Sequence, residues 1–388
     1  MLTTLAVANY RSLRDLAIPL GRLNLVTGSN GSGKSSVYRA LRLLAETAQG
    51  GVIRALAREG GLESALWAGP QEITHAMRQG RQSIDSTRRT EPTSLRLGFA
   101  SDKFGYLIDL GRPVPDGSPT KFGFDPAIKR ECIWTGPFLR RGAQFVDRNG
   151  GLVKIKDQSG EWQVLTVGLA SYDSMLMQLG DPRDGAEILQ LREHVRSWRF
   201  YDHFRTDVDA PARVPQIGTR TPVLSDDGHD LAAAIQTILE IGDPVALDDA
   251  VNDAFPGAAL SVDMVDGRFE LLMKQHGLLR PMRLTEVSDG TLRYLLLVAA
   301  LLTPRPPELL VLNEPETSLH PDLLPALARL IRKAATHSQV IVVSHAPRLV
   351  EPLQKGGCNA LELEKDFGET RVRGVGPLEQ PAWHWASR

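Results

Sequence analysis

The sequence predicts an α/β fold, and three observations support this prediction. A glycine-rich loop over 28–35 joins a short apolar strand over 23–27 to a helix that begins at Ser36. Residues 94–167 alternate apolar and polar side chains in several short runs, which is typical of antiparallel strands. The C-terminal block alternates apolar strands with helices, over 292–302, 309–312, 322–335 and 340–343. This alternation predicts a parallel sheet that is covered on both faces.

The glycine-rich loop fits the phosphate-loop pattern G-x-x-x-x-G-K-[ST] at every fixed position. The glycines let successive backbone N–H groups point at one anion, beside the positive end of the following helix. Lys34 can reach the β- and γ-phosphates of a nucleotide, and the Ser35 hydroxyl can bind Mg²⁺. The motif therefore predicts a site for a nucleoside triphosphate with Mg²⁺. Its residues are Gly28, Ser29, Asn30, Gly31, Ser32, Gly33, Lys34, Ser35 and the adjoining Ser36.

The other elements follow from periodicity and turn residues. Before the loop, a strand is predicted over 5–10, with its hairpin partner over 13–20. The β-rich middle has strands predicted over 94–99, 106–110, 144–148, 152–156 and 162–167, with a hairpin turn at Asn149-Gly150. Helices are predicted over 187–198, 230–239 and 244–255, before a hairpin of strands over 260–265 and 268–273. The polar stretch over 78–92 is predicted to be a mobile loop.

Charge and composition limit the class of function. The 388-residue chain has a formal net charge of −1, so no overall positive field indicates nucleic acid. Arginines cluster at 88–89, at 140–141 and at Arg192, Arg196 and Arg199. A solvated surface is the favoured explanation, and phosphate binding is the alternative. The two cysteines lie far apart, which argues against a disulfide scaffold or a zinc site. No leader and no apolar run of membrane-spanning length is found, so we expect a cytoplasmic protein without a membrane partner.

Polar residues follow two apolar strands of the C-terminal block. Asn313 and Glu314 come directly after the strand over 309–312, and His345 closely follows the strand over 340–343. The carboxyl ends of parallel strands are where ligands bind. Glu314 is placed to polarise a water for attack on the γ-phosphate, while Asn313 has the position that usually holds a Mg²⁺-coordinating Asp. His345 is a candidate to sense or stabilise the γ-phosphate.

A second anion-binding arrangement precedes the helix over 292–302, where Ser288 and Gly290 lie at the helix N-terminus. In their order along the chain, these motifs resemble those of the ABC-type ATPases, and more closely the RecF/SMC-like branch with its small AAA_21-type relatives. The similar segments are Asn9-Tyr10-Arg11-Ser12-Leu13 (N-terminal strand signature), Gly28 to Ser35 (Walker A), Val287-Ser288-Asp289-Gly290-Thr291 (ABC signature, normally L-S-G-G-Q), Asn313-Glu314-Pro315 (Walker B, normally D-E-P), Ser318-Leu319-His320-Pro321 (D-loop) and Ser344-His345 (switch histidine).

The resemblance implies a P-loop ABC-ATPase head with a mainly parallel sheet, an antiparallel β lobe and a helical insertion. It implies an N-terminal lobe over 1–170 and a helical insertion over 171–258. A C-terminal lobe over 259–388 would then hold the signature, Walker B and the switch histidine. ATP and Mg²⁺ are the implied cofactors.

The resemblance also implies roles for single residues. Glu314 and His345 would be catalytic, and Arg11, Ser12, Ser288 and Gly290 would join the phosphate loop in binding nucleotide. Mg²⁺ would be held by Ser35, by Asn313 and by a glutamine-loop residue, for which Gln178 is the candidate and Gln71 the alternative. An ordinary surface glutamine is as good an interpretation of either. Asn313 and Asp289 depart from the family pattern, and a neutral amide at 313 predicts weaker Mg²⁺ binding and slow ATP hydrolysis.

In this family, the signature of one subunit completes the ATP site of another, so the resemblance implies an ATP-dependent homodimer. We expect an ATP-gated, RecF-like clamp that hydrolyses ATP and binds duplex DNA in repair or recombination. The alternative is a regulatory ATPase of a defence or toxin-type system that controls a separate effector protein. A transport ATPase is disfavoured by the β-rich middle of the chain and by the segment over 9–13.

Overall fold

The computed structural model describes residues 1–70, 73–74, 77, 81, 94–114, 119–140, 142–181, 185–376 and 379–387. Gln71, the arginines at 88–89, Arg141 and most of the predicted loop over 78–92 lie outside the described residues. The chain forms two compact units, each built from separate stretches of sequence. Unit 1 comprises 1–20, 28–197 and 361–388, and unit 2 comprises 21–27 and 198–360. The division into two lobes and an insertion stays a prediction.

Unit 1 is built on an antiparallel sheet, which agrees with the predicted β lobe. Its strand order is β2 (Leu13–Pro19), β1 (Leu2–Tyr10), β4 (Ser94–Ser101), β5 (Phe104–Gly111), β6 (Ala127–Thr135), β7 (Gln144–Asn149), β8 (Leu152–Lys156) and β9 (Trp162–Thr166). Asn149 pairs with Leu152 across the β7–β8 turn, which confirms the predicted hairpin. The sequence does not predict β6, because three charged residues in a row, 129–131, hide its alternation.

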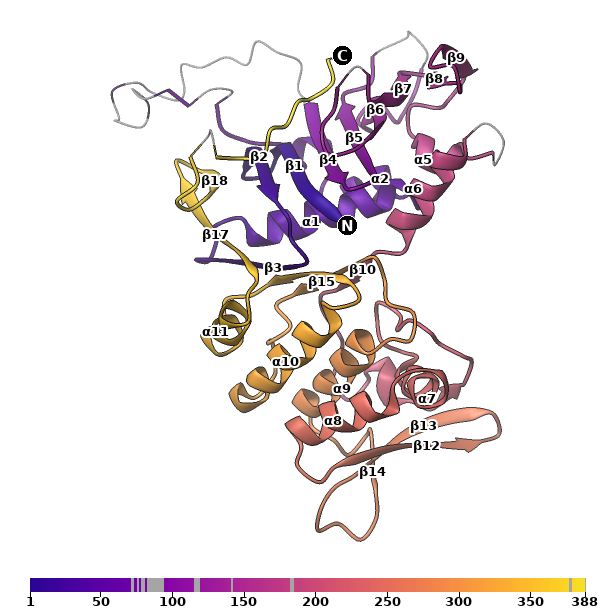
Figure 1. Cartoon of the computed structure of the whole chain (residues 1–388), viewed down its shortest axis with the longest axis vertical. Coiled ribbons are helices and arrows are strands. Elements are labelled where there is room, and N and C mark those ends of the chain that lie inside the picture. The colour runs from indigo at the N-terminus through magenta and orange to yellow at the C-terminus, as the bar shows by residue number, and fades with distance from the viewer. Residues whose placement is uncertain are drawn as a thin grey trace. The chain divides into compact units, whose positions relative to one another are not determined.

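Helices cover this sheet on one side. They are α1 (Lys34–Thr47), α2 (Val52–Arg58), α3 (Leu62–Ala65), α5 (Met175–Gln178) and α6 (Ala186–Arg196). The first of them, α1, packs against β1 and β4 (Figure 1). Unit 1 also holds most of the hairpin of β17 (Asn359–Asp366) and β18 (Glu369–Val372).

The C-terminal segment packs on unit 1 through tryptophans. The Trp383 ring centroid lies 5.6 Å from that of Trp134 on β6 and 5.4 Å from that of Trp385. Leu107 and Cys132 complete the small apolar cluster beneath them. Burial raises the pKa of the Cys132 thiol to about 12, so this cysteine stays protonated and chemically inert.

Unit 2 contains parallel strands in the order β10 (Arg199–Tyr201), β15 (Leu309–Asn313), β16 (Gln339–Val343) and β3 (Leu23–Gly28). The helices and 3-10 turns that pack with them are η2 (Pro211–Arg213), α7 (Leu231–Ile241), α8 (Pro244–Ala254), α9 (Asp289–Leu301), η3 (Pro321–Leu323), α10 (Leu324–Ala334) and α11 (Pro347–Lys355). A smaller antiparallel sheet contains β11 (Gln216–Ile217), β12 (Ala259–Val265), β13 (Arg268–Lys274) and β14 (Met282–Arg283). The predicted hairpin over 260–273 is thus confirmed as β12 and β13.

The expectation of a mainly parallel sheet is not confirmed. The largest sheet in the described ranges is the antiparallel one of unit 1, and the parallel pairs are those of β10, β15, β16 and β3. The reason lies in the connections, because parallel neighbours need a crossover of a dozen or more residues. Helices supply such crossovers in unit 2, whereas in unit 1 two-residue turns reverse the chain between β1 and β2, β4 and β5, and β7 and β8. No helix within the described ranges is long and apolar enough to cross a membrane.

Candidate nucleotide-binding site

The phosphate loop in unit 1 holds its lysine over its own backbone. Lys34 is the first residue of α1, and its Nζ donates to the carbonyl oxygens of Gly28 at 2.7 Å and Ser29 at 3.0 Å. Only 6% of its surface is exposed. A buried ammonium among carbonyl oxygens is well suited to hold an anion, because few water molecules screen its charge.

Thr370 of β18 fixes the conformation of this loop. Gly33 has a φ of +108°, and a Cβ there would come within 2.1 Å of the Thr370 hydroxyl, so glycine is required. The same hydroxyl lies 2.8 Å from Ser12 Oγ and 2.8 Å from the Ser32 carbonyl oxygen. Ser12 is therefore held beside the loop through a contact that the sequence does not reveal, and its role in binding nucleotide stays a prediction.

The loop offers hydrogen-bond donors that have no partner among the described residues. In the part of the chain that the structure describes, the buried Ser32 hydroxyl has no hydrogen-bond partner. The amides of Gly33, Lys34 and Ser35 have no backbone acceptor there either, as expected at a helix N-terminus. Ser29, Asn30, Gly31 and Ser35 are exposed, and Ser36 is half-buried. These donors suit the oxygens of a phosphate group.

Arg11 contacts a carboxylate. Its guanidinium donates to Glu59 Oε2 at 3.1 Å and 2.7 Å, and the Tyr10 hydroxyl donates to the same carboxylate. Burial, and then the hydrogen bond to Glu59, raise the pKa of Tyr10. Arg11 itself has a φ of +50° in the turn between β1 and β2. Its predicted role in binding nucleotide stays a prediction.

The candidate glutamine-loop residue, Gln178, is exposed at the end of α5. Ser174 caps this short helix by accepting from Leu176 N. The carbonyl oxygen of Met177 accepts from Arg192 at 3.3 Å, so one arginine of the predicted cluster is used within the protein. Arg196, another, pairs with Glu193 at 3.4 Å.

The predicted catalytic pair lies at the carboxyl ends of β15 and β16 in unit 2. Glu314 N donates to the Val343 carbonyl oxygen at 2.8 Å, and Glu314 has a φ of +47°, a strained value for a residue with a side chain. The Glu314 carboxylate lies 3.7 Å from His345 Nδ1. Both side chains are half-exposed, at 42% and 53%. The structure thus brings these two residues together, and their catalytic roles stay a prediction.

Glu316 positions the histidine, and the sequence analysis missed it. Its Oε1 accepts from the Ser344 hydroxyl at 2.7 Å and from His345 N at 3.0 Å. Only 9% of Glu316 is exposed, although it is charged. The signal available in the sequence was a second glutamate, two positions after Glu314.

Asp202 is the second residue that the sequence analysis missed. Because β10 and β15 pair in parallel, with Tyr201 beside Leu312, the next residues of the two strands are neighbours. Asn313 Nδ2 donates to Asp202 Oδ1 at 2.7 Å. The Asn313 Oδ1 atom is buried and has no partner among the described residues. The amide oxygen that would face a metal ion is therefore free, and a carboxylate lies next to it.

These oxygens suit a hard cation. Mg²⁺ is usually held by one or two oxygen side chains together with water and the phosphates of its substrate. The described residues contain no group of three His, Cys, Asp or Glu that could hold a metal by themselves. Asn313 Oδ1 with Asp202 nearby fits a metal that comes with its nucleotide.

Arg293 connects the signature helix α9 to this strand end. Its guanidinium donates to the carbonyl oxygens of Asp202 at 3.2 Å and Glu314 at 3.3 Å. The side chain is only 3% exposed, and this burial lowers its pKa. A shift of the first turns of α9 would therefore move Arg293 and disturb its hydrogen bond to the Glu314 carbonyl oxygen.

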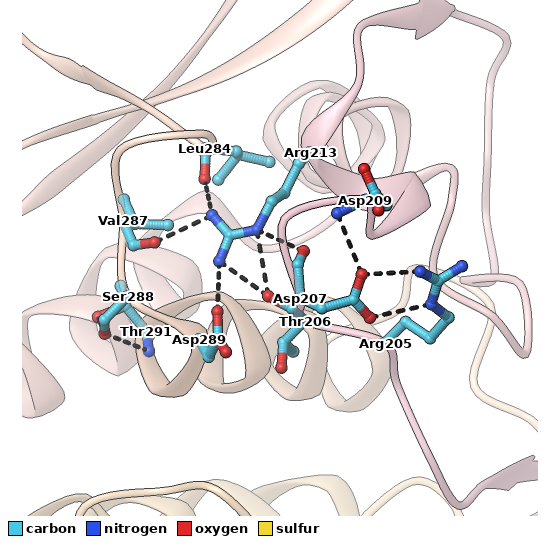
Figure 2. Close-up of polar contacts among 10 residues, drawn as sticks. All are labelled: Arg205, Thr206, Asp207, Asp209, Arg213, Leu284, Val287, Ser288, Asp289 and Thr291. Carbon is cyan, nitrogen blue, oxygen red and sulfur yellow. Dashed lines mark hydrogen bonds and ion pairs between the residues drawn. The ribbon is translucent and has the colours of Figure 1, made fainter.

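The signature motif itself forms a capped helix start. Ser288 is the N-cap of α9 and accepts from Thr291 N at 3.2 Å. A Cβ on Gly290 would lie 2.9 Å from the Ser318 carbonyl oxygen, so glycine allows the D-loop to approach the helix closely. Asp289 pairs with Arg213 of η2, and the distance between their polar atoms is 2.7 Å (Figure 2).

Family models match two parts of the chain. Residues 173–351 match AAA_21, described as "AAA domain, putative AbiEii toxin, Type IV TA system". Residues 1–91 match AAA_15, described as "AAA ATPase domain".

Two relatives match parts of the chain. The DNA replication and repair protein RecF of Idiomarina loihiensis is 32% identical over 146 residues, which are 37% of this chain and 36% of RecF. The OLD nuclease of Thermus scotoductus is 46% identical over 44 residues, 11% of this chain and 8% of that protein. The chain thus matches about a third of the RecF length and a small part of the nuclease.

A solved structure shares the fold over nearly the whole chain. The SmcHead bound to the C-winged helix domain of ScpA superposes with a TM-score of 0.51 at 14% identity, covering 96% of this chain and 97% of that chain. The protein therefore has an ATPase head fold. Together, the two family models and the RecF relative support an ABC-type ATPase of the RecF/SMC-like branch.

Proposed function

We propose that this protein binds ATP with Mg²⁺, hydrolyses it slowly, and acts as an ATP-gated homodimeric clamp on duplex DNA in repair or recombination. The observation that most supports this proposal is the phosphate loop, with its buried Lys34 and its unpartnered donors. The family matches support the ATPase reaction. The proposed clamp and its binding to duplex DNA rest on the resemblance to RecF.

The phosphate loop would bind the triphosphate through its amides and Lys34. Ser35, Asn313 and, through the glutamine loop, Gln178 are the residues that would hold Mg²⁺. When bound, this ion neutralises charge that develops on the phosphate oxygens. Asp202 adds the negative charge that Asn313 lacks, at a position next to it.

Glu314 is the proposed general base. It would take a proton from a water molecule while the water oxygen attacks the γ-phosphorus and the bond to the β-phosphate oxygen breaks. His345, held by Glu316, is placed to contact the γ-phosphate. The strained backbone of Glu314, held by Arg293 and by Val343, fixes the position from which its side chain extends.

Ser288 and Gly290 of a second copy would complete each site. The N-terminus of α9 has the donors and the dipole for a γ-phosphate. ATP would then join two copies, and hydrolysis would release them, so that ATP shifts an equilibrium between separate and joined heads.

The variant Glu314→Gln tests this proposal. Removing the base should lower turnover about 100-fold or more while leaving ATP bound, so the joined state should accumulate. We expect sedimentation to show a monomer without nucleotide and a dimer with ATP and Mg²⁺. Glu351→Gln, the same change at an exposed site on α11, should hydrolyse ATP like the unmodified protein. A Glu314→Gln protein that stays monomeric with saturating ATP would contradict the clamp.

The proposed binding of duplex DNA needs a separate measurement. Duplex DNA should bind with an affinity that falls as salt rises and increases when ATP is present. ATPase activity that no form of DNA stimulates would contradict this part of the proposal and would favour control of a separate effector protein.

Asp202→Ala tests whether this carboxylate supports the metal. Asn313 Nδ2 would lose its acceptor, and the nearest negative charge would be gone, so we expect about tenfold weaker binding of Mn²⁺, a spectroscopic substitute for Mg²⁺, with ATP present. Asp209→Ala, at an exposed site on the same segment, is the control. Equal Mn²⁺ affinity in the two variants would rule out a metal-supporting role for Asp202.

A further inference from the structure

Arg213 is a buried arginine that joins two segments of unit 2. It is 6% exposed, and its guanidinium donates to the carbonyl oxygens of Thr206, Asp207, Leu284 and Val287. Its remaining donor reaches Asp289 Oδ1 at 2.7 Å (Figure 2). Four of its five partners are neutral carbonyls, so Asp289 is the one contact with a formal charge among them.

Asp289 has an unfavourable position for a site that receives phosphate. It is the first residue of α9, between Ser288 and Gly290, and its side chain is 59% exposed. A carboxylate at a helix N-terminus stabilises the helix, but it competes with any other anion for the same positive end. An incoming γ-phosphate would meet a like charge within a few ångströms.

Glu286 is the other acidic residue beside Ser288, and it too is paired with an arginine. Arg280 donates to its two oxygens at 2.8 Å and 2.6 Å, and these bonds hold the pKa of Glu286 at about 2. Both members of this pair are at least partly exposed, at 69% and 36%, so water screens it. The Asp289 pair differs because its arginine is buried and cannot turn away.

We propose that Arg213 is a positioning residue that cancels the charge of Asp289 and so lets the N-terminus of α9 accept the γ-phosphate of a second copy. This inference rests on the proposed ATP-dependent dimer. It explains how a signature with aspartate in the usual place of glycine can still bind phosphate: the added negative charge has a dedicated, buried counter-charge.

The test is a charge rescue in the Glu314→Gln parent. Arg213→Gln keeps a donor near the carbonyl oxygens but removes the charge. ATP-dependent association should weaken about tenfold or more, as expected for an unpaired like charge near a protein surface. Adding Asp289→Asn removes the opposing charge, and association should return to within about threefold of the parent. Arg205→Ala, which removes an exposed arginine of the same segment, should leave association unchanged (Figure 2).

The outcomes distinguish an effect of the Arg213 charge from a purely structural role of Arg213. If Asp289→Asn fails to rescue Arg213→Gln, Arg213 acts only by holding the two segments, and the inference is overturned. Should Arg213→Gln not fold, Arg213→Lys keeps the charge without the planar set of donors, and it should retain most of the association. An Arg213→Lys protein that folds, as judged by its melting curve, yet no longer associates would also overturn the inference. A parent that does not associate with ATP at all would instead contradict the proposed dimer.

Discussion

Lys34→Ala is expected to weaken ATP binding about 100-fold or more. Truncating one partner of a buried charged contact costs about 2–5 kcal/mol, and Lys34 is a buried cation placed over the phosphate loop. Its two bonds to the carbonyl oxygens of Gly28 and Ser29 show that the ammonium is already held in position before nucleotide arrives. Calorimetric titration with ATP and Mg²⁺ would measure the loss.

The control is Lys103→Ala, because Lys103 is an exposed lysine in the same unit. The substitution removes one positive charge, as Lys34→Ala does. The affinity of this variant for ATP should stay within a factor of about two of that of the unmodified protein, since exposed charges contribute little. Melting curves without nucleotide would show whether the loop variant is still folded. An unchanged affinity in folded Lys34→Ala would mean that the loop does not bind phosphate in the proposed way.

Arg148→Met is expected to destabilise the protein by about 3–5 kcal/mol, because it leaves a buried carboxylate without its counter-charge. Arg148 and Glu131 are both 0% exposed and lie 2.6 Å apart. Glu131 also accepts from the Tyr106 and Ser174 hydroxyls, each at 2.6 Å, and from Met175 N at 2.9 Å. The loss would therefore affect the start of α5 as well as the sheet.

Arg112→Met provides the matched control, since Arg112 and Glu63 are exposed at 70% and 58%. An exposed pair contributes about 0–1 kcal/mol, so this variant should unfold at nearly the denaturant concentration of the unmodified protein. Urea unfolding followed by circular dichroism would compare the two. Similar unfolding midpoints for both variants would mean that water reaches Glu131, so that its carboxylate does not depend on the charge of Arg148.

The sequence predicts local structure well where one segment contains the whole pattern. The helix α7 has a clear period, α9 and β15 are continuous apolar runs, and the phosphate loop has every fixed residue. The sequence misses β10, because three residues are too few for a period to be visible. That omission also hid Asp202, whose position depends on β10 pairing with β15.

The sequence by itself determined the class of protein and the order of its motifs, since a loop, a strand end and a helix start are made by neighbouring residues. Tertiary structure decided which charges meet. Asp202 lies beside Asn313 because two distant strands pair, and Arg213 meets Asp289 because two loops pack together. In the sequence, such residues look like any surface Asp or Arg. Their chemistry depends on burial and on a partner far along the chain, and both arise only when the chain folds.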